Sequence, residues 1–136
     1  MSLKIATEFA ALLDNNEFGE ASELLAENCT YHYFEGDYQG RQNIINVYRM
    51  NYLQSKRIFD EMSYTSSVEE MAGGTYKIDF VDKIRKGQRW HEYRCYQVVS
   101  FSDNHISCIQ HSEIPGEIES LRLFFSRASV DKTNPS

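Results

Sequence analysis

One stretch of the chain, residues 88–114, constrains the fold more strongly than any other. Two runs rich in Val, Ile, Tyr and Phe flank the pair Asp103-Asn104. Asp and Asn tolerate the positive φ angles that tight β-turns require, so this pattern predicts a β-hairpin. The same stretch contains Trp90, three of the four His residues and two of the three Cys residues. We therefore expect a strongly curved sheet centred on this hairpin, with any chemistry on its concave face.

Length and composition predict a single soluble domain. A chain of 136 residues with 41% hydrophobic and 25% charged residues can bury a core without disulfides or a metal. No segment approaches the ~18 consecutive apolar residues of a membrane span. The first residues contain no apolar signal-peptide region. We therefore expect a cytoplasmic protein with no membrane partner.

Charge and cysteine spacing argue against two kinds of partner. The net charge of -6 argues against nucleic acid, because phosphate binding needs a concentrated basic face. The three cysteines, Cys29, Cys95 and Cys108, match no CxxC or zinc-ligand spacing. We expect them to be buried thiols, and we expect no metal site and no cofactor. The aromatic share of 13% predicts a ring-lined cavity, an aromatic dimer face, or both.

Hydrophobic periodicity divides the rest of the chain into helices and strands. Helical spacing predicts helices over residues 3–13, 17–27, 41–56 and 117–127. Period-two patterns and strand-favouring residues predict strands over residues 29–34, 62–70 and 75–84. Helices early in the chain and strands late indicate an α+β domain. We expect one domain over residues 1–127, followed by a flexible tail over residues 128–136.

Two further segments carry a resemblance to a known family. Residues 38–41 (Tyr-Gln-Gly-Arg) lead into a helix, and residues 98–106 span the turn of the late hairpin. With the preceding helical pair and strand, they resemble the nuclear transport factor 2-like superfamily. That superfamily includes ketosteroid isomerase, scytalone dehydratase, limonene epoxide hydrolase and the SnoaL-like polyketide cyclases. The resemblance implies a cone-shaped α+β barrel, in which N-terminal helices pack on a strongly curved, mainly antiparallel sheet and a short C-terminal helix follows.

The catalytic residues of one member of that superfamily, ketosteroid isomerase, can be compared with the matching positions of this chain. The catalytic Tyr, base Asp and protonated Asp of ketosteroid isomerase would fall near Phe9, Tyr33 and Gln97. None of the three residue types matches. That reaction needs a carboxylate to move the proton and acidic donors to hold the enolate oxygen. We therefore do not expect ketosteroid isomerase activity from this chain.

The register of the hairpin decides what the last strand faces. Strand alternation places His111 and Glu113 on one face whatever the turn does. With a simple two-residue turn, His111 faces Tyr96 and Glu113 faces Arg94, as a surface ion pair.

A bulged residue would change these neighbours. One extra residue in the hairpin brings Cys95 and Gln97 onto the face of His111 and Glu113. His91 has the same strand parity as these two and could then face the same cavity. We favour this register, which the resemblance also implies.

The candidate site follows from this register. We predict catalytic roles for His111, Glu113 and Tyr33, and ligand contacts for Tyr31, Gln97, His91 and Phe9. An imidazole beside a carboxylate can act as a general acid or base near neutral pH, and a Tyr hydroxyl can donate to a substrate oxygen. The alternatives are a surface ion pair at Glu113 and a Tyr ring that only fills the cone.

Two further carboxyl groups, those of Asp79 and Asp82, are not expected to belong to this site. Asp79 and Asp82 lie on opposite faces of their strand, so they do not form a catalytic pair.

These residues predict a small-molecule-binding, SnoaL-like protein with an aromatic cavity. As an enzyme it would be a cofactor-free lyase, isomerase or cyclase that acts on a small apolar or aromatic substrate by acid–base chemistry. The alternative is a non-catalytic ligand-binding or dimeric scaffold domain of the same fold. The fold and a second aromatic face, with Trp90, Tyr96 and Val98, also predict a homodimer.

Overall fold

The computed structural model describes residues 1–133 of the chain, and the side chains of residues 1–126. Its helices are α1 (Ser2–Asp14), α2 (Phe18–Glu23), α3 (Arg41–Ile58) and α4 (Glu117–Thr133). Its strands are β1 (Leu25–Tyr33), β2 (Gly36–Gln39), β3 (Glu61–Glu70), β4 (Tyr76–Lys86), β5 (Arg89–Ser102) and β6 (His105–Glu113). A short 3₁₀ turn, Ala72–Gly74, connects β3 to β4.

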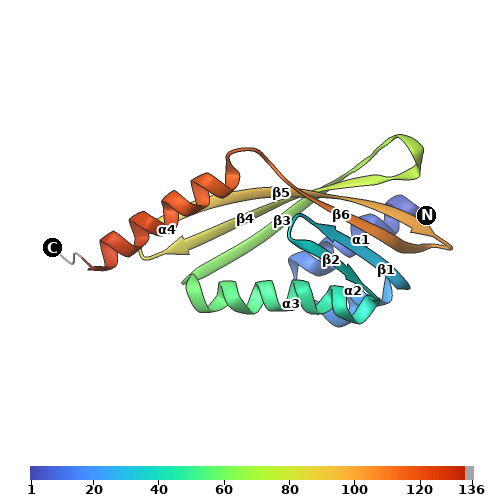
Figure 1. Ribbon diagram of the computed structural model, residues 1–136, viewed down its shortest axis with the longest axis horizontal. Helices are drawn as coiled ribbons and strands as arrows, with labels where there is room; N and C mark the ends of the chain where they lie inside the picture. The colour runs from blue at the N-terminus through green and yellow to red at the C-terminus, as the bar shows by residue number, and fades with distance from the viewer. Residues whose placement is uncertain (134–136) are drawn as a thin grey trace.

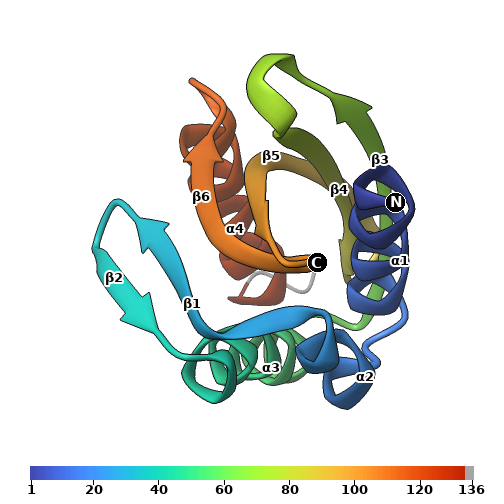
Figure 2. The ribbon, with the colours of Figure 1, turned by 90° about the vertical axis from the view of Figure 1, so that its right-hand side faces the viewer.

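The six strands form one curved sheet in the order β2-β1-β6-β5-β4-β3. Neighbouring strands are antiparallel except β1 and β6, which are parallel. Figure 2 shows the sheet arching from β2 to β3 without closing, with α1, α2 and α3 along its open side. α4 packs against β5 at one end of the molecule (Figure 1). The predicted α+β cone with a mainly antiparallel, strongly curved sheet is confirmed.

The first helix forms where the sequence predicts it. Ala6, Phe9, Ala10 and Leu13 recur at helical spacing, and all four are buried where α1 packs against β3 and β4. Asn16 follows with a φ of 60°, a left-handed conformation that Asn tolerates. The chain can therefore reverse directly into α2.

The second helix is shorter than predicted, because its last turn belongs to β1. The Leu24 carbonyl accepts a backbone hydrogen bond from Ile106 at 2.9 Å. Leu25 pairs with Ile106 across the parallel strands and is fully buried. Pairing with the hairpin thus overrides the helical propensity of residues 24–27.

β2 has no counterpart among the predicted strands. All four of its residues are exposed, so no alternation of apolar and polar residues marks it. It forms because it pairs antiparallel with β1, where Tyr38 lies opposite Tyr31.

The last helix continues past its predicted end at residue 127 to Thr133. The predicted flexible tail, residues 128–136, therefore starts within α4, and residues 134–136 lie outside the described residues. Within residues 1–133, no helix is both long and apolar enough to cross a bilayer.

The central hairpin has a two-residue turn and a bulge. Asp103 and Asn104 adopt φ angles of 50° and 64°, which a tight primed turn requires. Phe101 pairs with Ile106, but the next pair is Ser100 with Cys108. Ser107 is the extra residue of β6.

This bulge confirms the favoured register. Gln97 lies opposite His111, and Cys95 lies opposite Glu113. The other register, in which Arg94 faces Glu113, does not occur, and Arg94 instead forms an ion pair with Glu92 at 2.8 Å.

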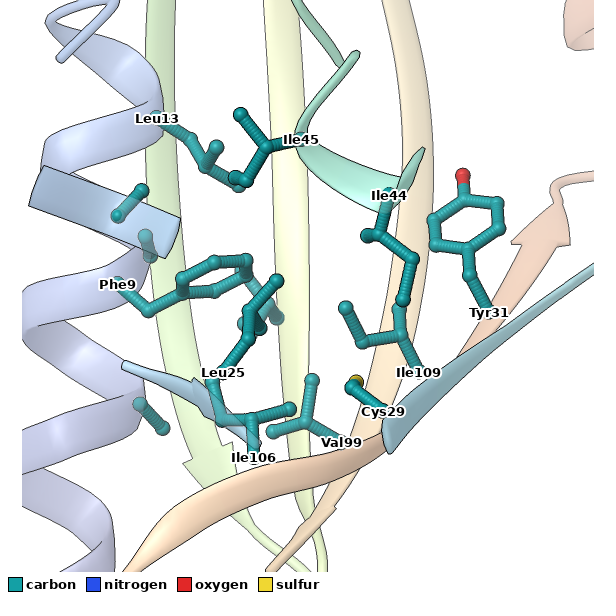
Figure 3. Close-up of a cluster of buried hydrophobic side chains, with 14 of the residues drawn as sticks. Phe9, Leu13, Leu25, Cys29, Tyr31, Ile44, Ile45, Val99, Ile106 and Ile109 are labelled. Atoms are coloured by element: carbon teal, nitrogen blue, oxygen red, sulfur yellow. The ribbon is translucent and has the colours of Figure 1, made fainter. Parts of the chain in front are cut away.

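A cluster of buried apolar side chains fills the space between α1, α3 and the sheet (Figure 3). Phe9, Leu25, Ile44 and Ile106 are fully buried there. Each such side chain contributes roughly 1.5–3 kcal/mol of burial free energy. Tyr31 lies at the margin of the cluster and also lines a cavity.

Candidate ligand cavity

A cavity of about 530 Å³ lies between the helices and the concave face of the sheet. Side chains from all four helices and from all six strands line it. Many of them are rings, including Tyr31, Tyr33, Tyr48, Tyr64, Phe80 and Tyr93. A volume of this size accommodates a small organic molecule.

A chain of hydrogen bonds crosses the cavity wall at Gln97. The Tyr48 hydroxyl on α3 donates to Gln97 Oε1 at 2.7 Å. Gln97 Nε2 then donates to the Tyr31 hydroxyl at 3.2 Å and to His111 Nδ1 at 3.1 Å. Only 3% of Gln97 is exposed, and these partners satisfy its amide, whose burial would otherwise be costly.

These contacts set the protonation of His111. Nδ1 accepts from Gln97, so in the neutral ring the proton lies on Nε2. Nε2 donates to Glu113 Oε1 at 2.8 Å, and the Tyr93 hydroxyl donates to Glu113 Oε2. Both nitrogens of His111 are therefore held by the protein, and both Glu113 oxygens have donors.

Two tyrosine rings enclose the His111 imidazole. The Tyr31 ring is stacked with it at a centroid distance of 6.3 Å, and the Tyr33 ring meets it edge-on at 5.0 Å. Burial, and then the nearby Glu113 carboxylate, raise the pKa of Tyr33, so its phenol stays protonated. Within residues 1–126 the Tyr33 hydroxyl forms no hydrogen bond. It remains able to donate to a ligand.

A second polar region of the wall is acidic. Asp82 on β4 lines the cavity, and burial, followed by the charges of Asp14 and Glu113, raises the pKa of Asp82 to about 7. Asp14 on α1 accepts a hydrogen bond from Ser66 at 2.6 Å, and burial raises the pKa of Asp14 as well. A carboxyl group with a pKa near neutrality can exchange protons at physiological pH.

Five of the seven predicted site residues line this cavity: Tyr31, Tyr33, Gln97, His111 and Glu113. Phe9 does not line the cavity. It is fully buried in the core, edge-on to Tyr48 at 6.1 Å.

His91 lies on the predicted face of β5, but α4 covers it. Its ring stacks on Phe124 at a centroid distance of 5.1 Å and an interplanar angle of 21°. Its buried Nε2 has no hydrogen-bond partner among the described residues.

Three residues of the site were not predicted from the sequence: Tyr48, Tyr93 and Asp82. Tyr48 belongs to the apolar stripe of α3, and nothing local distinguishes it from a core ring. Asp82 and Tyr93 are opposite one another on β4 and β5. Strand parity was a usable signal for Asp82, because it shares its face with Ile78 and Phe80.

No protein-family model and no curated protein sequence matches this chain. Solved structures do match it closely in shape. A candidate polyketide cyclase from Pseudomonas putida superposes with a TM-score of 0.64 at 8% identity, over 87% of this chain and 95% of that one. An epoxide hydrolase from M. tuberculosis, similar to limonene epoxide hydrolase, has a TM-score of 0.64 at 14% identity, over 99% and 96%.

A third similar structure is an NTF2-like protein of unknown function from Cytophaga hutchinsonii. It has a TM-score of 0.62 at 15% identity, over 88% of this chain and 95% of that chain. At these identities the similarity establishes the fold and does not extend to the activity. The chain has the nuclear transport factor 2-like fold, as the resemblance in its sequence implied.

Proposed function

We propose that this chain binds a small apolar or aromatic molecule in the cavity and acts on it as a cofactor-free lyase, isomerase or cyclase. The main support is a partly open, ring-lined cavity of about 530 Å³ whose wall contains an ordered series of proton donors and acceptors. Rings remove a ligand from water, and a few fixed polar groups orient it. Proteins described as a candidate polyketide cyclase and an epoxide hydrolase share the fold, which fits this class of chemistry.

In this proposal Tyr33 donates a hydrogen bond to a ligand oxygen. The His111–Glu113 pair accepts the proton that leaves a ligand carbon, and Tyr31 and Gln97 contact the ligand. The lone pair of His111 is on Nδ1, so the Gln97 amide first moves away and the ligand proton binds to Nδ1. Gln97 Oε1 can then accept a hydrogen bond from the new N–H. The Glu113 carboxylate, 2.8 Å from Nε2, then stabilises the imidazolium.

Deuterium exchange tests the acid–base chemistry without knowledge of the natural substrate. The protein is incubated in D₂O with a panel of small aromatic ketones, both neutral and amine-bearing, and loss of the α-C–H signal is followed by NMR. We expect exchange faster than in buffer. Tyr33→Phe should slow it by roughly a hundredfold, because an oxyanion donor is lost. His111→Gln should slow it by a similar factor.

Tyr96→Phe provides the matched control. Tyr96 lies on the other face of β5 and does not line the cavity, so exchange should be unchanged. Ligand binding without any exchange would contradict the catalytic proposal and leave the binding function in place.

That outcome would support a second candidate function, a non-catalytic ligand-binding protein. One observation favours it: both ring nitrogens of His111 already have protein partners, at 3.1 Å and 2.8 Å. A base that is fully hydrogen-bonded within its own wall must break one of these contacts before it can act.

We also propose that the protein forms a homodimer through the outer face of the sheet. Trp90 is 53% exposed, and Tyr96 and Val98 are partly exposed on this face. Exposed aromatic residues are enriched at protein interfaces. Sedimentation velocity should detect a dimer at micromolar concentration, and a monomer alone would refute it.

A further inference from the structure

The wall of the cavity is acidic as well as aromatic. Its carboxyl groups belong to Asp14, Glu35, Asp82 and Glu113. Among the side chains of residues 1–126, no Lys or Arg lines the cavity. Ring faces carry partial negative charge and attract cations. The wall therefore opposes the binding of an anion and favours a positively charged group.

Two of these carboxyls are already stabilised by the protein. Asp14 accepts a hydrogen bond from Ser66 at 2.6 Å. Glu113 accepts from His111 at 2.8 Å and from the Tyr93 hydroxyl. Both carboxyls therefore already have hydrogen-bond donors in the wall, although burial still raises the pKa of Asp14.

Asp82 differs from both, because no group within residues 1–126 hydrogen-bonds to its carboxyl. It lies on β4 between Tyr64 of β3 and Tyr93 of β5, which are its cross-strand neighbours. The Tyr93 hydroxyl donates to Glu113, and the Tyr64 hydroxyl contacts the sulfur of Met62 at 3.2 Å. Neither phenol is directed to Asp82. Its carboxyl faces the cavity without a protein partner.

This environment destabilises the ionised form of the Asp82 carboxyl. Burial raises its pKa to about 7, and Asp14 and Glu113 add to the effect by repulsion. A cation placed in the cavity would offset both costs, because it pairs with the carboxylate and neutralises the surrounding field. A neutral ligand can donate a hydrogen bond to the carboxylate but does not neutralise the surrounding field.

We infer that the ligand of this cavity is an organic cation, an aromatic molecule with a protonated amine, whose ammonium group binds Asp82 while its ring packs on the tyrosines. The inference rests on the proposed function only in that the cavity binds a small molecule. It does not depend on whether the bound molecule then reacts.

Three small molecules of similar shape but different charge test which ligand charge the cavity prefers. These are 2-naphthylmethylamine, 2-naphthylmethanol and 2-naphthoate, which carry positive, zero and negative charge at about pH 8. Titration calorimetry should show that the amine binds at least about tenfold more tightly than the alcohol, and that the naphthoate binds most weakly.

Asp82→Asn keeps the shape of the side chain and removes its charge. It should weaken binding of the amine about tenfold and change binding of the alcohol by less than about threefold. Asp79→Asn is the matched control, since Asp79 is on the same strand, does not line the cavity and pairs with Lys77 at 3.6 Å. This control should bind all three probes as the unmodified protein does.

Proton release gives a second, independent readout. At about pH 7, binding of the amine should release part of a proton from Asp82, measured by calorimetry in two buffers of different ionisation enthalpy. The release should be absent in Asp82→Asn.

The outcomes separate the two proposals. If the alcohol or the naphthoate binds as tightly as the amine, the inference is wrong and the proposed binding function stands. Equal affinity of the amine for Asp82→Asn and Asp79→Asn would also overturn the inference. If none of the three probes binds, both proposals fail.

Discussion

Gln97 and His111 face each other across β5 and β6, with Gln97 Nε2 3.1 Å from His111 Nδ1. The direction of this hydrogen bond is set from α3, because the Tyr48 hydroxyl donates to Gln97 Oε1 and leaves the amide NH₂ to face the imidazole. A helix residue thus determines which nitrogen of a strand histidine carries the proton.

This arrangement predicts the tautomer of His111. In ¹⁵N NMR spectra at about pH 8, Nε2 should carry the proton and Nδ1 should be unprotonated. Tyr48→Phe removes the hydroxyl that orients Gln97, so it should change the His111 ring signals. Tyr52→Phe, one turn further along α3 and also lining the cavity, should not. A proton on Nδ1 in the unmodified protein would refute the assignment.

Asp82 should make the protein less stable as the pH rises. Its pKa is 3.8 when unfolded and about 7 when folded, so the native state holds the proton more tightly between these values. The contribution of Asp82 to stability is therefore most favourable below about pH 4 and is lost as the pH rises through about 7. Asp82→Asn should raise the free energy of unfolding by roughly 2–4 kcal/mol at about pH 8, with little effect at about pH 4.

Urea unfolding at the two pH values measures this difference. Asp79→Asn, on the outer face of β4, should show no comparable dependence on pH. An Asp82→Asn variant that is equally affected at both pH values would contradict the predicted titration of Asp82.

Phe9 should contribute to stability through the core. It is fully buried between α1 and the sheet and packs edge-on against Tyr48 at 6.1 Å. Phe9→Ala should lower the free energy of unfolding by roughly 3–5 kcal/mol, through lost burial and the resulting cavity. Leu3→Ala, at a position 45% exposed, should change it by less than about 0.5 kcal/mol in the same urea titration.

The proposed dimer predicts a specific effect at Val98. Val98 lies on the outer face of β5, next to Lys77 and Gln110 on the adjacent strands. Val98→Arg adds a second positive charge beside Lys77 and should raise the dimer dissociation constant by at least about tenfold. Met50→Arg, at an exposed position on α3, should leave the sedimentation profile unchanged.

Much of the fold can be predicted from local patterns. The apolar stripe of α1, the alternation of β4 and the Asp103-Asn104 turn each depend on residues close together in the chain. The end of α2 and the existence of β2 could not be predicted in this way. Both depend on pairing with strands that are distant in the sequence. Pairing with β6 overrides the helical pattern at the end of α2, and pairing with β1 forms β2 where the local sequence has no strand pattern.

For the site, the sequence by itself determined that His111 and Glu113 share one face of the last strand, because side chains alternate with a period of two. The tertiary structure decided which face that is. The bulge at Ser107 shifts the register by one residue and brings Gln97, rather than Tyr96, opposite His111.

Tertiary packing also brought Tyr48 to Gln97, and placed Asp82 in the same cavity wall as His111 and Glu113. These residues come from α3, β4, β5 and β6, and the distance between them depends on how the sheet curves around the helices. Periodicity within one element carries no information about that curvature. The sequence thus determined the chemistry available on each strand, and the folded sheet determined which groups meet in one cavity.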